Sequence, residues 1–324
     1  MKEKLPTIFV MIPAYRDPVL LQTIRNVLHN ADYPERVFIA IGAQYDDEIP
    51  MPDLSEFPSL QIKLLSIHPQ NRPATYRLRH VLNKLYAHED YYLSIDSHTD
   101  LKDGWDTDLI RILEGEEQYK TILTFYDVPH SDIPGIYTDR QLAVSPGVLN
   151  DEAVSRQGTY PVQHYPHLYA EHDAELKLPR GYLPETHYLP AGLFFTRGQF
   201  AREIRWGQYW QNDQEEPFLS YETFMMGWIK KLLFGNDIVM HQPQEYYKAV
   251  YEMDLDGGSR GFKDEWQPQK DDLESVRPKI WEAYLHNTGP FKIRGALKKP
   301  HEWWDQIGLL PDYFKYTSHD GELF

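Results

Sequence analysis

The chain has 324 residues, a formal net charge of −16, 41% apolar residues and no cysteine. The apolar share is large enough for a hydrophobic core, which excludes a disordered chain. Without cysteine there are no disulfides, thiolate metal sites or cysteine nucleophile, and the acidic charge argues against general binding to nucleic-acid phosphates. No apolar stretch is long enough for a membrane span or a secretory signal, so we expect a soluble, cytoplasmic protein.

Apolar runs and helical patterns alternate along the first 128 residues. The continuous apolar runs are typical of buried parallel strands, and Asp17 and Pro18 suit the N-cap and first position of a helix. We predict strands over 7–15, 36–44, 61–68, 91–96 and 120–128, and helices over 17–31, 75–89 and 105–115. This alternation predicts an α/β fold with a mostly parallel sheet and helices on both faces.

The second half of the chain is less regular. Residues 128–185 are rich in Pro, Gly, His and Asp, which predicts an irregular acceptor-side insertion or loop. Residues 187–204 predict a strand, a turn and a helix, and residues 218–235 predict one helix that ends at Gly235. A short strand over 236–242 and helical patterns over 273–287 and 300–310 follow. We expect a domain over 1–250 and a helical C-terminal extension over 251–324 that packs on it.

The strand over 91–96 ends in the triplet Asp96, Ser97 and His98. Ligands of open α/β sheets bind at the carboxyl ends of the strands. Alternation along an extended chain would put residues 96 and 98 on one side and Ser97 on the other. A carboxylate and an imidazole suit Mn²⁺ or a similar cation, with diphosphate oxygens as further ligands. The simpler alternative is that Asp96 caps a turn.

Four segments carry a resemblance to a known family: 12–44, 71–110, 189–200 and 221–238, in that order. The most specific part is EDYYLSIDSH followed by GWD. The series resembles the cytosolic polypeptide α-N-acetylglucosaminyltransferases that modify hydroxyproline. These are distantly similar to the mucin-type polypeptide GalNAc-transferases, which also carry D-x-H. The resemblance covers roughly residues 7–250.

The resemblance implies a GT-A (Rossmann-like) fold, a UDP-sugar donor, Mn²⁺ or Mg²⁺, and retention of anomeric configuration. It implies that Asp96 and His98 bind the metal and that Glu222 is the catalytic carboxylate, against the donor sugar or the acceptor. The nucleotide-sugar-binding residues that it implies are Ala14, Tyr15, Arg16, Gln44, Asp46, Arg77, Asp96, Ser97, Ala191 and Gly192.

The chain departs from the family at the third metal ligand. The family supplies a His on a late strand, for which this sequence offers His241, but the family's spacing falls nearer Tyr247. His187 or another residue is the alternative. The segment NRPATYRLR also lacks the small residues expected before the D-x-H strand, so donor and acceptor identity stay open.

Several of these residues also have purely structural interpretations. Tyr15 and Arg16 would then close a loop, Gly192 would serve a turn, Glu222 would be a helix-surface charge, and Arg77 would pair with Glu89 or Asp90.

The predicted function is transfer of GlcNAc or a related hexose from a UDP-sugar to a hydroxyl acceptor, with a polypeptide as one option. Transfer to a glycan or modified base is an alternative, and so is a non-catalytic nucleotide-sugar or partner-binding module on the same fold. A nucleotidyltransferase is disfavoured because IPAYRDP lacks a Gly-rich phosphate loop.

Overall fold

The computed structural model describes residues 5–47, 49–68, 75–125, 183, 185–186, 189–206, 215–233, 238–241, 286–288 and 292–307. These residues belong to two compact units. The first unit contains every described strand, and the second contains residues 224–227 and the described residues from 286 onward. None of the helices in the described part of the chain is long and apolar enough to cross a membrane.

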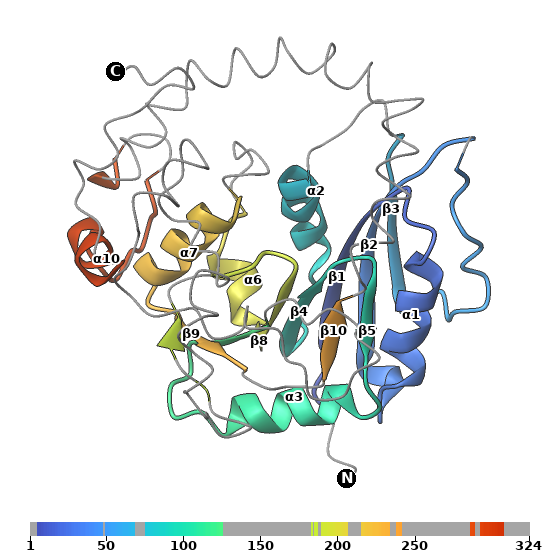
Figure 1. Cartoon of the computed structure of the whole chain (residues 1–324), viewed down its shortest axis with the longest axis horizontal. Helices are drawn as coiled ribbons and strands as arrows, with labels where there is room; N and C mark the ends of the chain where they lie inside the picture. The colour runs from blue at the N-terminus through green and yellow to red at the C-terminus, as the bar shows by residue number, and fades with distance from the viewer. Residues whose placement is uncertain are drawn as a thin grey trace, which may run out of the picture. The chain divides into compact units, whose positions relative to one another are not determined.

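One mixed sheet of eight strands forms the first unit, in the order β3-β2-β1-β4-β8-β6-β9-β7 (Figure 1). The neighbours from β3 to β4 run parallel, whereas β8 is antiparallel to both β4 and β6. β9 runs parallel to β6, and β7 is antiparallel to β9. The strands are β1 Ile8–Tyr15, β2 Val37–Gln44, β3 Ile62–Ser66, β4 Tyr91–Ile95, β6 Thr121–Thr124, β7 Glu185–Thr186, β8 Leu193–Arg197 and β9 Ile229–Leu232.

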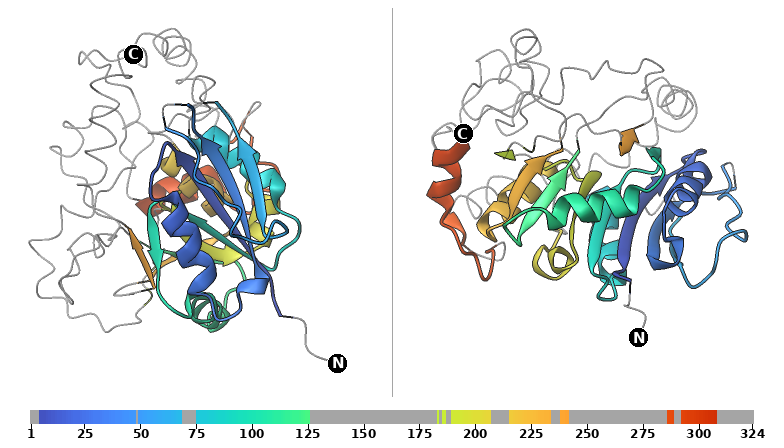
Figure 2. Two further views of the ribbon diagram at one scale, coloured as in Figure 1. Left: turned by 90° about the vertical axis from the view of Figure 1, so that its right-hand side faces the viewer. Right: turned by 90° about the horizontal axis from the view of Figure 1, so that it is seen from below.

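Helices cover both faces of the parallel half of this sheet (Figure 2). Leu20, Ile24 and Val27 of α1 and Leu109 of α3 share one core with alternate residues of β1 and β2. On the other face α2 approaches β2 closely, since a Cβ on Gly42 would lie 2.6 Å from Leu78. The helices are α1 Leu20–His29, α2 Thr75–Leu82, α3 Trp105–Glu114, α6 Gln199–Glu203 and α7 Glu215–Met225, with 3₁₀ turns Pro34–Arg36 and Asn83–Leu85. The predicted α/β class with a mostly parallel sheet is confirmed.

A separate two-stranded ladder lies next to the triplet that follows β4. β5, Thr99–Leu101, pairs antiparallel with β10, Val239–His241. This register sets the backbone of His241 opposite Thr99, one residue beyond His98. The ladder therefore brings a segment from late in the chain to the end of β4.

The prediction of one helix over residues 218–235 is wrong. α7 ends at Met225, and residues 229–232 form β9. Gly227 has φ of +77° and donates its N–H to the carbonyl of Phe224, while Trp228 donates to Thr223, both over 2.9 Å. These two bonds make a Schellman ending, which a glycine in the left-handed region allows.

The other predicted helix and strand boundaries either differ less from the structure or lie outside the described residues. α1 begins at Leu20, so Asp17 and Pro18 precede the helix rather than start it. The pattern over 300–310 is confirmed as α10, Pro300–Ile307. The insertion over 128–185 and the helix over 273–287 fall almost wholly outside the described residues, so the predicted division at residue 250 stays a prediction.

Candidate active site

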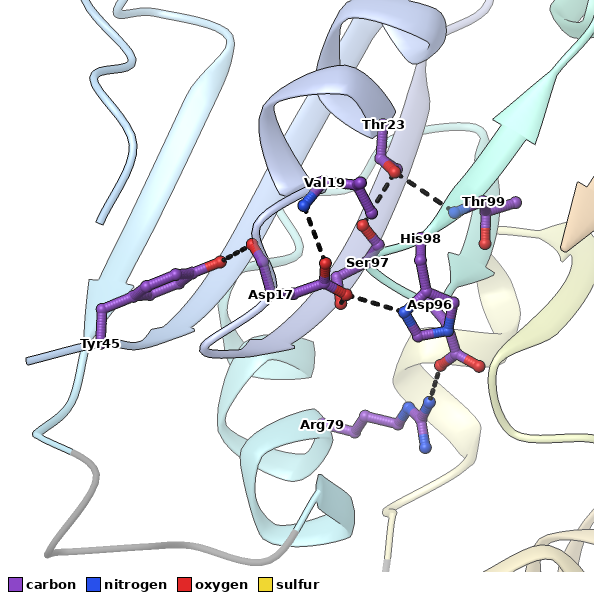
Figure 3. Close-up of polar contacts among 9 residues, drawn as sticks. All are labelled: Asp17, Val19, Thr23, Tyr45, Arg79, Asp96, Ser97, His98 and Thr99. Atoms are coloured by element: carbon purple, nitrogen blue, oxygen red, sulfur yellow. Dashed lines mark hydrogen bonds and ion pairs between the residues drawn. The ribbon is translucent and has the colours of Figure 1, made fainter. Parts of the chain in front are cut away.

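The triplet from Asp96 to His98 forms a turn between β4 and β5 (Figure 3). The side chains of Ser97 and His98 both bind Oδ2 of Asp17, over 2.6 Å from Ser97 Oγ and 2.8 Å from His98 Nδ1. The predicted alternation, with Ser97 on the opposite side from His98, is therefore wrong. It assumed an extended chain, whereas the chain bends directly after Ile95.

Asp17, which the sequence predicts only as a helix cap, instead connects two loops. Its side chain is buried, and its Oδ1 accepts the N–H of Val19 over 3.0 Å. Its backbone carbonyl accepts the hydroxyl of Tyr45 over 2.6 Å. The carboxylate is thus fixed by groups on its own loop and on the segment after β2, with Oδ2 directed at the triplet.

Thr23 of α1 fixes the same turn from its other end. Its hydroxyl donates to the carbonyl of Ser97 over 2.8 Å and accepts the N–H of Thr99 over 3.2 Å. Figure 3 shows both bonds beside those of Asp17. Helix α1 therefore holds the backbone of the triplet, and Asp17 holds two of its side chains.

Asp96 is oriented by a different residue, Arg79 of α2. Nη2 of Arg79 lies 2.8 Å from Oδ1 of Asp96, and the side chains are 5% and 30% exposed. Close approach of Gly192 leaves room for this carboxylate, because a Cβ there would lie 2.6 Å from Cγ of Asp96. The adjacent carbonyl of Ala191 accepts the hydroxyl of Ser94 over 2.7 Å. The need for glycine at 192 is thus steric.

Glu222 is buried in α7, so its interpretation as a helix-surface charge is wrong. Its Oε1 accepts the backbone N–H of Arg205 over 3.3 Å, and Oε2 has no hydrogen-bond partner among the described residues. Burial raises the pKa of Glu222 to about 7. Trp206, the residue after Arg205, lies under the Arg79 guanidinium, with Cζ of Arg79 6.0 Å from the centroid of the Trp206 ring. Glu222 is thereby linked to the Arg79–Asp96 pair through two adjacent residues.

The predicted nucleotide residues near β1 and β2 meet at the carboxyl ends of these strands. Ala14 pairs with Ala43 and Tyr15 with Gln44 in the parallel register. Just beyond, Arg16 has φ of +47° and its side chain forms an ion pair with Asp46. Five of the predicted residues are therefore gathered at this edge: Ala14, Tyr15, Arg16, Gln44 and Asp46.

Arg77 is exposed and is not the arginine that reaches Asp96. Its suggested surface partners have other contacts: Glu89 pairs with Lys63 and Asp90 accepts from Thr7. Arg79 was missed, although its position gave a signal. It stands three residues before Leu82 on the buried side of α2, where an unpaired charge is costly.

The donor atoms of the triplet fit a divalent cation through two ligands. His98 contacts Asp17 through Nδ1, so a carboxylate–histidine–metal arrangement would use its Nε2. Asp96 has a second oxygen, Oδ2, beside the one that Arg79 contacts. Within the described ranges, no three His, Asp or Glu side chains form a metal-binding group. The side chains of His241 and His187 lie outside what the structure describes, so the third ligand stays a prediction.

Comparison with solved structures gave weak overall similarities. GalNAc-T7 with UDP, GalNAc and Mn²⁺ is 12% identical, over 75% of this chain and 45% of that chain, with a TM-score of 0.49. S. aureus TarS 1-349 is 11% identical, over 75% of this chain and 63% of that chain, with a TM-score of 0.47. The complex of TarS 1-349 with UDP-GlcNAc is 12% identical, over 73% of this chain and 58% of that chain, with a TM-score of 0.45. The chain spans less than two thirds of each of these structures.

Family models gave a more extensive match. No curated protein matches the chain in a sequence search. Residues 7–57 and 51–230 match the family model described as Glycosyltransferase (GlcNAc), and these segments include Asp17, Arg79, the Asp96–His98 triplet, Gly192 and Glu222 but not His241. Because these segments cover well over half of the chain, it belongs to the GlcNAc glycosyltransferase family.

Proposed function

We propose that the protein is a metal-dependent, retaining glycosyltransferase of the GT-A class. It transfers GlcNAc or a related hexose from a UDP-sugar to a hydroxyl acceptor. The observation that carries this proposal is the turn at the end of β4, where Asp17 orients His98 and Arg79 orients Asp96. This arrangement lies within the segment that matches the family model.

The residues of the turn have distinct roles in this proposal. Asp96 and His98 hold Mn²⁺ or Mg²⁺, which, when bound, supplies Lewis-acid neutralisation of the departing diphosphate. Gly192 leaves room for the Asp96 carboxylate itself. Arg16 and Asp46, paired at the ends of β1 and β2, form the edge to which the nucleotide binds.

Glu222 acts at the sugar. A carboxylate with a pKa near 7 is present in both protonation states at neutral pH. Two retaining routes are compatible with it. In the first, the acceptor hydroxyl attacks from the leaving-group face as the anomeric C–O bond to UDP breaks, a phosphate oxygen of UDP takes the hydroxyl proton, and Glu222 stabilises the oxocarbenium-like transition state. In the second, the Glu222 carboxylate displaces UDP to form a glycosyl-enzyme, and the acceptor hydroxyl then displaces Glu222 and gives its proton to a phosphate oxygen of UDP. In both routes the chain contributes positioning and electrostatic stabilisation.

Release of UDP from a panel of UDP-sugars tests this function. We expect hydrolysis or transfer with UDP-GlcNAc or UDP-GalNAc in the presence of Mn²⁺ and none with a chelator. Asp96→Asn should abolish turnover, whereas Asp103→Asn, an exposed carboxylate nearby, should not. His98→Asn should behave like Asp96→Asn, with the exposed His29→Asn as its control. Full metal-dependent turnover by Asp96→Asn would overturn the assignment.

Acceptor and donor identity follow from the same assay. Mass spectrometry of reactions with peptides, glycans and small hydroxyl compounds would identify the acceptor. If UDP binds in the presence of Mn²⁺ but no UDP-sugar is ever turned over, the chain is a binding module rather than an enzyme. The cytoplasmic location stays a separate prediction.

A further inference from the structure

Asp17 lies outside the set of residues that the family resemblance assigns, yet its side chain contacts the proposed metal ligand His98 directly. Its Oδ2 lies 2.8 Å from Nδ1 of His98, and both side chains are buried. The two residues are 81 positions apart in the chain. A buried contact between such distant segments fixes the imidazole far more than a surface contact would.

We propose that Asp17 is a positioning residue that selects the tautomer and the ring orientation of His98. A carboxylate only accepts hydrogen bonds, so Nδ1 of His98 carries the hydrogen of this bond. In the neutral ring Nε2 is then the unprotonated nitrogen, which is the tautomer that binds a cation through Nε2. This inference rests on the proposed function, because it gives His98 the role of a metal ligand.

Three further contacts show that the Asp17 carboxylate is held in place rather than adapting to His98. The N–H of Val19 binds Oδ1 over 3.0 Å, and Ser97 Oγ binds Oδ2 over 2.6 Å. Tyr45 binds the backbone carbonyl of Asp17 over 2.6 Å. With both oxygens and the backbone occupied, the acceptor is fixed before any cation binds, and ring rotation of His98 would break its bond.

Asp17→Asn tests the proposal with little change of shape. The amide of Asn can donate to Nδ1, which moves the ring hydrogen to Nε2 and blocks the metal-binding nitrogen. We expect the Kd for Mn²⁺, measured by electron paramagnetic resonance without donor, to rise about 10–100-fold. Asp103→Asn controls for the lost negative charge.

A second measurement does not depend on the folding of Asp17→Asn. Long-range ¹H–¹⁵N correlation spectra of the metal-free wild type report the tautomer of each imidazole. The chain has 14 His, so the His98 signals are assigned by their loss in His98→Asn. An Nδ1–H tautomer supports the proposal, and an Nε2–H tautomer overturns it. An unchanged Kd in folded Asp17→Asn also overturns it.

The experiments distinguish failure of the proposed metal dependence from failure of the proposed role of Asp17. A wild-type chain that binds no Mn²⁺ overturns the metal dependence of the proposed function. In that case the tautomer of His98 still decides whether Asp17 holds the imidazole.

Discussion

Nη2 of Arg79 donates a hydrogen bond to Oδ1 of Asp96 over 2.8 Å, between a buried guanidinium and a partly exposed carboxylate. The same guanidinium lies over the ring of Trp206, which follows Arg205, the backbone donor to Glu222. Arg79 is therefore the residue through which α2 orients the end of β4 and contacts the segment that binds Glu222.

Arg79→Gln should weaken both folding and the site. The variant removes a charge-assisted hydrogen bond and leaves Asp96 without its cationic partner. We expect the free energy of unfolding to fall by about 1.5–3 kcal/mol, measured by urea denaturation, and the KM for the UDP-sugar to rise. Arg111→Gln, at an arginine that is 69% exposed, should change neither. Unchanged stability and KM in Arg79→Gln would show that the pair is unimportant.

Gly192→Ala should damage the site more than its one added methyl group suggests. The new Cβ would lie 2.6 Å from Cγ of Asp96, so the carboxylate must move away. Such overpacking costs about 1–3 kcal/mol, and we expect Mn²⁺ affinity to fall with it. At Gly115, where the nearest atom to a Cβ would be 3.3 Å away, alanine should be tolerated. Calorimetric titration of both variants with Mn²⁺ checks this, and equal affinities would contradict it.

Strands β1, β2 and β4 of the parallel half could be predicted from the sequence because they are buried on both faces. Continuous apolar runs such as IFVMIPAY then mark β1 without ambiguity. The prediction of one helix over residues 218–235 was wrong because an apolar run alone does not distinguish one long helix from a helix followed by a strand. Gly227 carried the signal, as a glycine after a helical pattern.

Without the family resemblance, the sequence predicted only those residues of the candidate site whose side chains are common metal ligands and which directly follow a predicted strand. Asp96 and His98 follow a buried strand, so they stood out as a pair. Asp17 and Arg79 act through contacts that cross 81 and 17 positions of the chain. Local patterns assigned Asp17 to a helix start, and the family resemblance pointed to Arg77 rather than Arg79, because neither carries information about which loops of this chain meet in space.

Asp106 of the GWD segment should prove structural rather than functional. It is fully buried, and its carboxylate accepts the N–H groups of Asp32 and Tyr33 and pairs with Arg36 over 2.8 Å. Asp106→Asn leaves Arg36 buried without its charge partner, which costs about 3–5 kcal/mol. Urea denaturation should show this loss, with exposed Asp103→Asn as the control, while Mn²⁺ affinity of the folded fraction stays the same. Weakened Mn²⁺ binding would instead assign GWD to the site.

Glu222 should make stability depend on pH. Burial raises its pKa from 4.5 to about 7, so between these values the folded protein keeps a proton that the unfolded chain has released. The free energy of unfolding therefore falls as the pH rises through this window, by an amount on the order of 3 kcal/mol.

Glu222→Gln isolates this contribution, because glutamine resembles the protonated carboxyl at every pH. The variant should match the wild type near pH 4.5 and become the more stable of the two above pH 7. Urea denaturation across this range checks the difference, and exposed Glu117→Gln should follow the wild type throughout. A difference that stays constant with pH would mean that Glu222 titrates like an ordinary surface carboxylate.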